Sequence, residues 1–356
     1  MVINKFKNKK VLITGHTGFK GSWLTLFLKL AGAKIMGISL KPTTKPSFFK
    51  AINLSKGIRN NYLNILNRKK LENKIISFKP DFIFHLAAQP LITEAYTKSF
   101  LTWETNLIGT INILEIVKKL KKSCTCVLIT SDKCYENIEK RSGYKETDRI
   151  GGSDPYSASK ASAEIAIKSY FQSFLIKSNH RIATARAGNV IGGGDWNYGR
   201  IIPDCMFALN KKKSVIIRNP NASRPWQHVV EIVYGYLKLA ILLKENIKLN
   251  GQSFNFGPSR KKIHKVNNIL QEIKREWKDF EWSGDKKQKT MNETNLLVLN
   301  CDKSKRILNW DLKMTFKKTI KLTIDWYIAF YEKDKKKKNI RSITEKQILD
   351  YCKLVK

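Results

Sequence analysis

The sequence has no grouping of cysteine or histidine that would hold a metal ion or a set of disulfide bonds. Only 5 histidines occur, and no two cysteines form a Cys-x-x-Cys pair. Structural zinc sites need clustered ligands of this kind, and disulfide-rich domains need paired cysteines. We therefore expect no metal site, and we expect reduced thiols in a cytoplasmic protein. The six cysteines are Cys124, Cys126, Cys134, Cys205, Cys301 and Cys352.

Long hydrophobic runs are also missing. The basic amino-terminal residues are followed only by Val11, Leu12 and Ile13 before Thr14 and Gly15, which is too short for the apolar centre of a signal peptide. No stretch approaches the roughly 20 apolar residues that a membrane-spanning helix needs. The sequence therefore predicts a protein without a membrane partner.

Acidic residues are scarce. The chain has 29 Asp and Glu against 67 Lys and Arg, which gives a formal net charge of +38. Such an excess raises the alternative of a basic nucleic-acid-binding protein, which would gather its cations on one face and bind with a steep salt dependence. The lysines here are spread along the chain, with only short runs such as 211–213 and 335–338. We therefore expect no nucleic-acid partner.

A glycine pattern stands near the beginning of the chain, between an apolar segment and a helical pattern. Gly15, Gly18 and Gly21 follow a predicted strand at 9–14 and lead into a predicted amphipathic helix at 22–31. Glycines at this spacing permit a tight turn and bring backbone N–H groups to a pyrophosphate at the helix N-terminus. The context therefore predicts a dinucleotide site. Its predicted contacts are Gly15, Thr17, Gly18, Phe19, Lys20, Gly21, Lys41, Leu86, Ala87, Ala88 and Asn106.

One position of this site leaves the choice of dinucleotide open. Sites of this kind commonly have Asp or Glu about twenty residues after the glycines, where the carboxylate holds the ribose 2′-hydroxyl. This chain has Lys41 there, at the end of a predicted strand at 34–40. A cation can accommodate a 2′-phosphate, so NAD and NADP are both alternatives on physical grounds.

Hydroxyl and amine groups gather in the middle of the chain. Ser131 follows the apolar run 126–129, while Tyr156 and Lys160 follow Asp154, which we predict to cap a helix with a proline at its first position. Tyr156 and Lys160 are four residues apart and share one helix face. An ammonium beside a phenol lowers the tyrosine pKa, which makes a base for a sugar hydroxyl. The alternative is an ordinary exposed Tyr and Lys, because this spacing alone is a weak signal.

Strand and helix patterns alternate through the first half of the chain, which predicts a doubly wound parallel sheet of the Rossmann type. Beyond residue 188 the regularity fades, and we expect a smaller mixed α/β lobe over the carboxyl edge of the sheet. We place an NAD-binding domain at 1–188 and a mainly substrate-binding lobe at 189–356, with some return of the chain to the sheet. The remaining predicted helices are 69–78, 102–120, 156–176, 202–211, 228–243, 266–277 and 315–331. The remaining predicted strands are 82–86, 126–131, 181–187, 215–218, 253–256 and 296–299, with a weaker one within 55–66.

Longer motifs resemble those of a known enzyme family. The glycine turn followed by Tyr-x-x-x-Lys is similar to the extended short-chain dehydrogenase/reductases, and within them the chain resembles the CDP-glucose 4,6-dehydratases up to about residue 330. The segments that carry the resemblance are 15–23, 130–135, 186–196, 218–220 and 224–228. It implies a cytoplasmic lyase of deoxysugar biosynthesis, for example for lipopolysaccharide O-antigen, that acts on CDP-glucose. In such an enzyme NAD takes hydride from carbon 4, water leaves from carbons 5 and 6, and the hydride returns to carbon 6.

The resemblance also implies a role for each residue of the central stretch. Tyr156 takes the proton of the 4-hydroxyl, and Lys160 lowers the tyrosine pKa and holds the nicotinamide ribose, so both also contact the cofactor. Ser131 hydrogen-bonds the 4-hydroxyl, and Asp132 protonates the departing 6-hydroxyl. Lys133 stands where sister dehydratases have Glu, which fits the CDP branch and leaves the base for the carbon 5 proton open.

The second half of the chain offers groups for a nucleotide diphosphate. Arginines form bidentate bonds with phosphates and aromatic rings stack on a base or a sugar, although the same residues have an alternative as lobe core or surface cations. We predict a homodimer in which helices 102–120 and 156–176 of two copies form a four-helix interface. The predicted substrate contacts are Gln89, Asn189, Trp196, Arg200, Arg218, Arg224 and His228, with Trp226 as a second stacking ring.

Two departures from the family pattern keep alternatives open. The family commonly has Gly-Asp near Asn61 and Tyr62, where the Asp meets the adenine, and an acidic residue near Lys41. Weaker cofactor binding and an inactive relative are therefore alternatives. A 4-epimerase or a dehydratase for another nucleotide sugar is a further alternative, although epimerases of this superfamily generally lack an acid at the position of Asp132.

Overall fold

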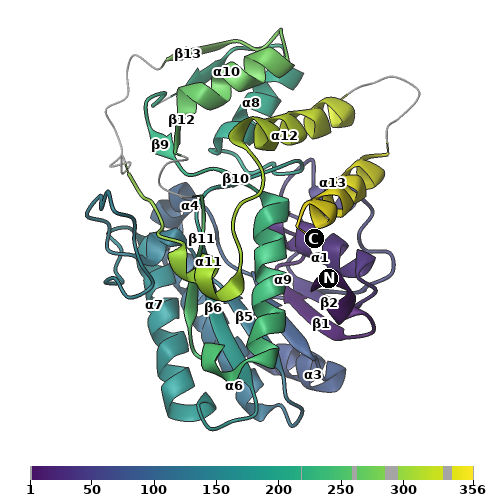
Figure 1. Cartoon of the computed structure of the whole chain (residues 1–356). Coiled ribbons are helices and arrows are strands. Elements are labelled where there is room, and N and C mark those ends of the chain that lie inside the picture. The colour runs from purple at the N-terminus through teal and green to yellow at the C-terminus, as the bar shows by residue number, and fades with distance from the viewer. Residues whose placement is uncertain (1, 218, 259–262, 285–295, 332–338, 356) are drawn as a thin grey trace.

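The computed structural model describes residues 2–217, 219–258, 263–284, 296–331 and 339–355. Seven parallel strands form one sheet in the order β11-β6-β5-β4-β1-β2-β3, with helices on both faces (Figure 1). This confirms the predicted doubly wound Rossmann-type sheet. The strands are β1 (Lys10–Thr14), β2 (Lys34–Ser39), β3 (Arg59–Tyr62), β4 (Phe82–His85), β5 (Thr125–Ile129), β6 (Arg181–Ala187) and β11 (Ser253–Phe256).

The sheet is buried on both faces, which explains its continuous apolar strands. Along β1, Val11 and Ile13 belong to one hydrophobic core, whereas Leu12 belongs to a second core on the opposite face. This alternation follows from the two-residue period of a strand. The first core is covered mainly by α1 (Phe19–Leu30) and α9 (Val229–Glu245), and the second by α3 (Arg68–Phe78), α6 (Gly109–Lys119) and α7 (Pro155–Tyr170).

Helix α1 differs from the amphipathic helix predicted at 22–31. It begins at Phe19, and its residues from Gly21 to Leu28 are all buried. The reason is that α1 is enclosed by α2 (Phe48–Ala51), α9 and α13 (Ile340–Leu354) as well as by the sheet. The carboxyl-terminal helix α13 was not predicted. Its position over α1 depends on contacts between residues far apart in the sequence, which a local sequence pattern does not indicate.

The long helix predicted at 102–120 is interrupted. It consists of α5 (Ser99–Trp103), a π-helical turn η2 (Glu104–Ile108) and α6. Such π-turns are frequent at functional sites, and this one turns Asn106 inward. The helix after Tyr156 likewise ends in a π-helical turn, η4 (Phe171–Leu175).

The smaller lobe lies beyond one end of the sheet (Figure 1). It contains α8 (Ile201–Asn210), α10 (Val266–Glu276), α12 (Phe316–Tyr331) and three two-stranded pairs. The strand predicted at 296–299 is wrong, because only an isolated bridge between Tyr144 and Leu299 forms there. The paired strands are β7 (Val190–Ile191), β8 (Val215–Ile217), β9 (Ser223–Arg224), β10 (Gln227–His228), β12 (His264–Lys265) and β13 (Trp282–Gly284). Short elements elsewhere are η1 (Val2–Phe6), α4 (Ile92–Thr97), η3 (Asp132–Cys134), η5 (Ile247–Leu249) and α11 (Asp302–Leu308).

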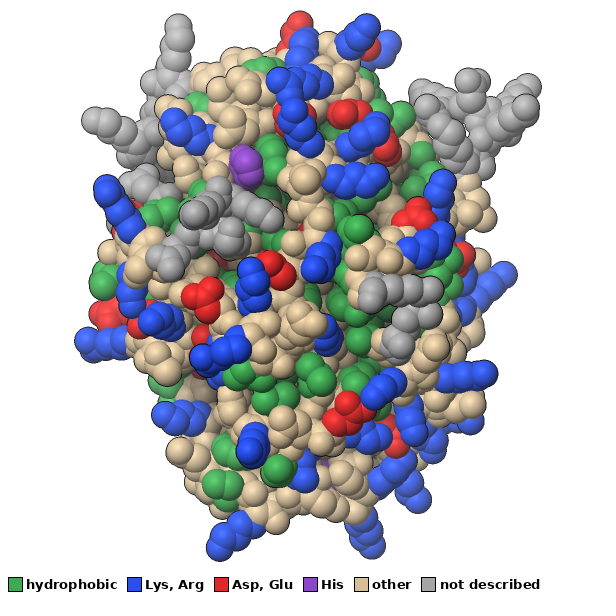
Figure 2. Space-filling model, in the orientation of Figure 1, with side chains coloured by type: hydrophobic (Ala, Val, Ile, Leu, Met, Phe, Trp, Pro, Cys, Tyr) green, Lys and Arg blue, Asp and Glu red, His purple; other side chains and the backbone are tan. Residues whose placement is uncertain are grey.

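No disulfide bond forms in the described residues, which include all six cysteines. Among the described residues, no helix has both the length and the apolarity needed to cross a bilayer. Figure 2 shows lysine and arginine side chains scattered over the visible face rather than gathered over one element.

Candidate active site

A cleft of about 530 Å³ lies between the carboxyl ends of the strands and the lobe. Its sheet side is lined by Phe19 and Lys20 of α1, the segment after β5, and Tyr156 of α7. Its lobe side is lined by residues of the segments 187–204 and 215–226. Ligands bind at this edge in doubly wound folds, so the cleft is the candidate active site.

The glycine turn lies directly before Phe19 and Lys20, the two residues of α1 that line the cleft. Gly15 has φ +76°, and a Cβ there would lie 2.7 Å from the backbone nitrogen of Ala87. A Cβ on Gly21 would lie 2.0 Å from the carbonyl oxygen of Gly15. Thr17 fastens the turn to the end of β2 through its hydroxyl, 2.8 Å from the Ser39 hydroxyl oxygen. Gly18 is exposed and is the N-cap residue of α1. The first N–H groups of α1 have no acceptor within the helix, so they fit a diphosphate.

The remaining predicted cofactor residues lie just after β4, just after β2 and on the π-helical turn η2. Leu86, Ala87 and Ala88 are half-buried directly after β4, beside the turn, and Lys41 is exposed just past β2. Asn106 is buried, and its amide donates to the Gln89 carbonyl and to the Ser159 hydroxyl. Both donors of Asn106 are thus used inside the protein, where they hold the segment after β4 against α7, and its contact with a cofactor stays a prediction.

His85 is a packed core residue at the end of β4. Its ring nitrogens lie 2.7 Å from the Thr14 hydroxyl and 3.1 Å from the Thr110 hydroxyl. Burial, assisted by the nearby Lys160 charge, lowers the pKa of His85 to about 3. The ring is therefore neutral at physiological pH.

Ser131, Asp132 and Tyr156 meet at the centre of the cleft. Asp154 caps α7 by accepting from the backbone N–H groups of Tyr156 and Ser157 at 2.9 and 3.0 Å, with Pro155 at the first position, as predicted. The Ser131 hydroxyl donates to Asp132 Oδ1 at 3.0 Å and also bonds with the Tyr156 hydroxyl. Lys133 lies half-buried in the same loop and lines the cleft.

The ionisation of Tyr156 differs from the expectation. Burial raises the pKa of Tyr156 to about 12, although the hydrogen bond from Ser131 acts in the opposite direction. Burial and the neighbouring Lys20 lower the pKa of Lys160 to about 8, against a raising influence of Glu164. The predicted lowering of the Tyr156 pKa is therefore wrong in this structure, because burial dominates and the neighbouring cation that acts to lower this pKa is Arg200.

Lys20 brings a further cation into the cleft. Burial and the Arg200 charge lower the pKa of Lys20 to about 8, and the carboxylates of Asp132 and Asp195 act in the opposite direction. Arg200 forms an ion pair of 2.9 Å with Asp195. The cleft thus gathers cations next to both the glycine turn and the lobe, which suits anionic ligands.

Several predicted substrate residues line the cleft. Asn189, Arg200 and Arg224 do so, and Trp226 joins them with most of its ring covered. Arg218 lies outside the described residues. Asp195 also lines the cleft but was not predicted as a site residue, although it lies in the segment 186–196. Its ion pair with Arg200 becomes visible only in the folded structure.

Three predicted substrate residues lie outside the cleft lining and make contacts within the protein. Trp196 is 1% exposed and packs among the aromatic rings of α12. His228 is buried at the start of α9, where its ring accepts from the Val230 N–H and lies edge-on to Trp23. Gln89 uses its side chain to close its own loop through the N–H and carbonyl of Leu91. None of these three side chains lines the cleft.

Comparison with known proteins identifies the family. The family model for GDP-mannose 4,6 dehydratase matches residues 12–323. A CDP-glucose 4,6-dehydratase from Salmonella typhimurium is 39% identical over 333 residues, which is 92% of each chain. A UDP-glucose 4-epimerase from Mycoplasma pneumoniae is 25% identical over 91% of this chain and 98% of its own length.

Solved structures share the fold. An epimerase from Methanothermobacter thermautotrophicus superposes with a TM-score of 0.80 at 21% identity, covering 92% of this chain and 94% of the epimerase. A dTDP-glucose 4,6-dehydratase from Bacillus anthracis, in complex with NAD, has a TM-score of 0.73 at 22% identity, covering 90% and 96%. The resemblance inferred from the motifs is confirmed, and the chain belongs to the GDP-mannose 4,6 dehydratase family within the extended short-chain dehydrogenase/reductases.

Proposed function

We propose that this chain is a CDP-glucose 4,6-dehydratase, a lyase that converts CDP-glucose into CDP-4-keto-6-deoxyglucose and water. The observation that carries the proposal is the cleft itself, which brings together the start of α1 after the glycine turn, the Ser131–Asp132–Tyr156 cluster and the arginines of the lobe. The name of the Salmonella relative supports cytidine as the base. In this assignment residues 1–188 hold mainly the cofactor and residues 189–356 mainly the nucleotide sugar.

NAD is the proposed cofactor, and the solved Bacillus anthracis dehydratase, which binds NAD, supports this choice. The glycine turn fits its diphosphate, with Lys20 as a nearby cation. When bound, NAD supplies the acceptor for the hydride of carbon 4 and returns that hydride to carbon 6. The cofactor is therefore regenerated in each cycle and is needed only in catalytic amounts.

Tyr156 takes the proton of the sugar 4-hydroxyl. Because burial holds its pKa near 12, the phenol loses its proton only when positive charge stabilises the phenolate. Arg200 is the neighbouring cation that acts to lower this pKa, and Lys160, which has a pKa of about 8 and is mostly protonated at neutral pH, is the second positive charge of this proposal. Ser131, which bonds with the Tyr156 hydroxyl, holds the 4-hydroxyl in line for this transfer.

Asp132 and Lys133 serve the elimination. The ketone at carbon 4 acidifies the hydrogen of carbon 5, and removal of that proton lets the 6-hydroxyl leave as water. Asp132, fixed by its bond with Ser131, is the acid that protonates this hydroxyl. Lys133 lines the cleft in the same loop and is the candidate base for carbon 5.

The lobe binds the nucleotide diphosphate. Arg200 and Arg224 line the cleft and offer bidentate bonds to phosphate oxygens. Trp226 lies at the same wall and offers a partly covered ring for a base or a sugar.

The proposed assembly is a homodimer through α5, α7 and their neighbours. Helices α5 and α7 pack against each other, and together with the π-turns they expose large apolar side chains. Phe100 is 75% exposed and Ile165 58%, while Ile108 and Phe174 are also exposed. Packing these side chains between two copies would remove this apolar surface from water. We also propose a cytoplasmic location and a role in deoxysugar supply for lipopolysaccharide O-antigen, which follow from the free thiols and from the activity.

Substrate turnover tests the proposal. The protein is incubated with CDP-, dTDP-, GDP- and UDP-glucose in turn, with substoichiometric NAD, and the products are identified by mass and by NMR. We expect the 4-keto-6-deoxy product from CDP-glucose alone, and none from the Tyr156→Phe variant. A product epimerised at carbon 4 would establish the epimerase alternative, and turnover of another nucleotide would change the assigned base.

A further inference from the structure

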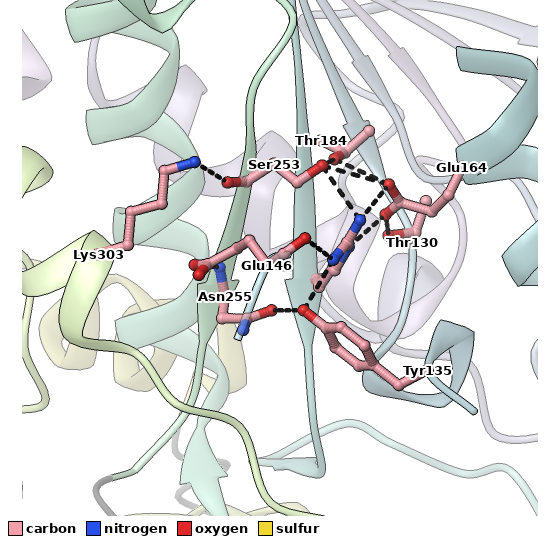
Figure 3. A network of polar contacts seen from close by, with 9 residues as sticks. Thr130, Tyr135, Glu146, Glu164, Thr184, Ser253, Asn255 and Lys303 are labelled. Atoms are coloured by element: carbon pink, nitrogen blue, oxygen red, sulfur yellow. Dashed lines mark hydrogen bonds and ion pairs between the residues drawn. The ribbon is translucent and has the colours of Figure 1, made fainter. Parts of the chain in front are cut away.

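A buried ion pair lies behind the cleft. Arg186 on β6 donates from Nε and Nη2 to the two carboxylate oxygens of Glu164 on α7, each at 2.9 Å. Both side chains are only 3% exposed. Thr130 and Thr184 also donate to this carboxylate, at 2.5 and 3.2 Å, and Figure 3 shows both hydroxyls directed at Glu164. The carboxylate is therefore fully satisfied without any ligand.

The pair holds both ends of the loop that carries the proposed acid. Thr130, which bonds Glu164, immediately precedes Ser131. Tyr135, which follows the loop, accepts a bond of 2.7 Å from Arg186 Nη1 and donates one of 2.7 Å to Asn255 on β11. The four residues between these anchors, 131–134, are thereby fastened to α7 and β6.

Glu164, the acidic member of the pair, also places a negative charge beside Lys160. Glu164 lies one helical turn after Lys160 on α7, and both are buried. Its negative charge raises the pKa of Lys160, whereas Lys20 on α1 lowers it. The other titratable groups facing Lys160 are Cys134, which also raises its pKa, and His85 on β4, which is neutral.

Stability alone does not explain this arrangement, because a buried ion pair often contributes little compared with apolar residues of similar volume. We propose that Glu164 and Arg186 are positioning residues, which together fix the 131–134 loop against α7, and that the Glu164 carboxylate is the counter-charge of Lys160. This inference rests on the proposed function, since it assigns the pair to the proton transfers of that reaction. Neither side chain lines the cleft, so both act through their neighbours.

Three variants test the inference. The double variant Glu164→Gln with Arg186→Met removes both charges together, which avoids leaving one of them buried and unpaired. Glu164→Asp keeps the charge and shortens its reach to Thr130 and Arg186. Glu72→Gln makes the same chemical change in the exposed pair of Glu72 with Lys119 and is the matched control.

The readouts are the titration of Lys160, followed by NMR of 13Cε-labelled lysine and assigned with Lys160→Met, and the pH dependence of turnover of CDP-glucose. In the double variant we expect Lys160 to titrate about 1 pH unit lower, the low end for loss of an adjacent opposite charge. The upper pH limit of kcat/KM should fall with it, and kcat should drop at least tenfold. Glu164→Asp should keep the parental titration and pH limit while losing kcat, and the control should change neither.

A folded double variant whose Lys160 titrates as in the parent would overturn the inference. Should the double variant not fold, parental kcat in Glu164→Asp would overturn it instead. If the parent fails to turn over CDP-glucose, the proposed function is wrong, and the lysine titration still decides whether Glu164 is the counter-charge of Lys160. The two failures are therefore distinguishable.

Discussion

Replacing the buried Lys160 by Met should stabilise the protein while abolishing its activity. The pKa of Lys160 falls from 10.5 to about 8 on folding, since burial and Lys20 disfavour its charge. At about 1.4 kcal/mol per pKa unit, this difference of roughly 2.5 corresponds to about 3 kcal/mol. Methionine has a similar length and no charge to desolvate, so Lys160→Met should recover much of this energy.

The sign fixes the pH range of the effect. A lysine whose pKa is lowered by folding is charged in both states below pH 8, where its full cost is present. Between pH 8 and 10.5 the folded state loses its proton first, so the cost declines, and above 10.5 it is gone. The stability gained by Lys160→Met should therefore be largest below pH 8 and shrink steadily as the pH rises.

Urea unfolding at a series of pH values measures this difference. Lys168→Met on the same helix is the control, because Lys168 is exposed and its replacement should change little at any pH. The reasoning is refuted if Lys160→Met is less stable than the parent at neutral pH, or if its gain is the same on both sides of pH 8.

Three further predictions concern the cleft and the assembly. Asp132→Asn should lower turnover by about 10²–10⁴-fold, while reduced cofactor accumulates on mixing with CDP-glucose; parental turnover would remove Asp132 as the acid. Gly21→Ala should abolish NAD binding in calorimetry, because its Cβ would lie 2.0 Å from a carbonyl oxygen of the turn, whereas Gly284→Ala, with nothing within 4 Å, should not. Phe100→Glu should give a monomeric mass by light scattering, while Ile138→Glu, an equally exposed apolar position in a loop, should leave the mass unchanged.

The sheet was predictable because each of its strands carries its own signal. Buried parallel strands are short apolar runs, and the segments 181–187 and 253–256 coincide with β6 and β11. The covering of a helix is different, since it depends on distant segments. The helix after the glycine turn was predicted to be amphipathic, and its outer side is buried because α2, α9 and α13, the last more than three hundred residues later, pack around it.

The positions of the residues proposed for catalysis were easier to predict than the positions of the residues proposed for substrate binding. Ser131, Asp132 and Tyr156 lie at ends of regular elements, where a strand or a capped helix fixes the direction of the side chain. Trp196 and His228 lie in irregular segments of the lobe, where a polar or aromatic side chain is as readily a core residue as a ligand contact. Trp196 in fact packs on α12, and His228 caps α9. A short sequence motif does not indicate whether such a side chain packs in the core or contacts a ligand.

Burial and neighbouring positive charges lower the pKa values of both Lys20 and Lys160. The neighbouring charges are related to the ligands that the cleft is proposed to bind. Both NAD and a nucleotide sugar carry a diphosphate, and Lys20, Lys160 and Arg200 are close enough to disfavour one another's charge. Asp132 and Asp195 offset this repulsion only in part, since both lysines still titrate near 8. An anion bound among these cations relieves the repulsion, so its binding free energy includes a part of the stability that folding sacrificed. The cost that Lys160→Met should remove therefore has two parts: desolvation by burial, which is the larger, and repulsion by Lys20, which is the part that also favours anionic ligands.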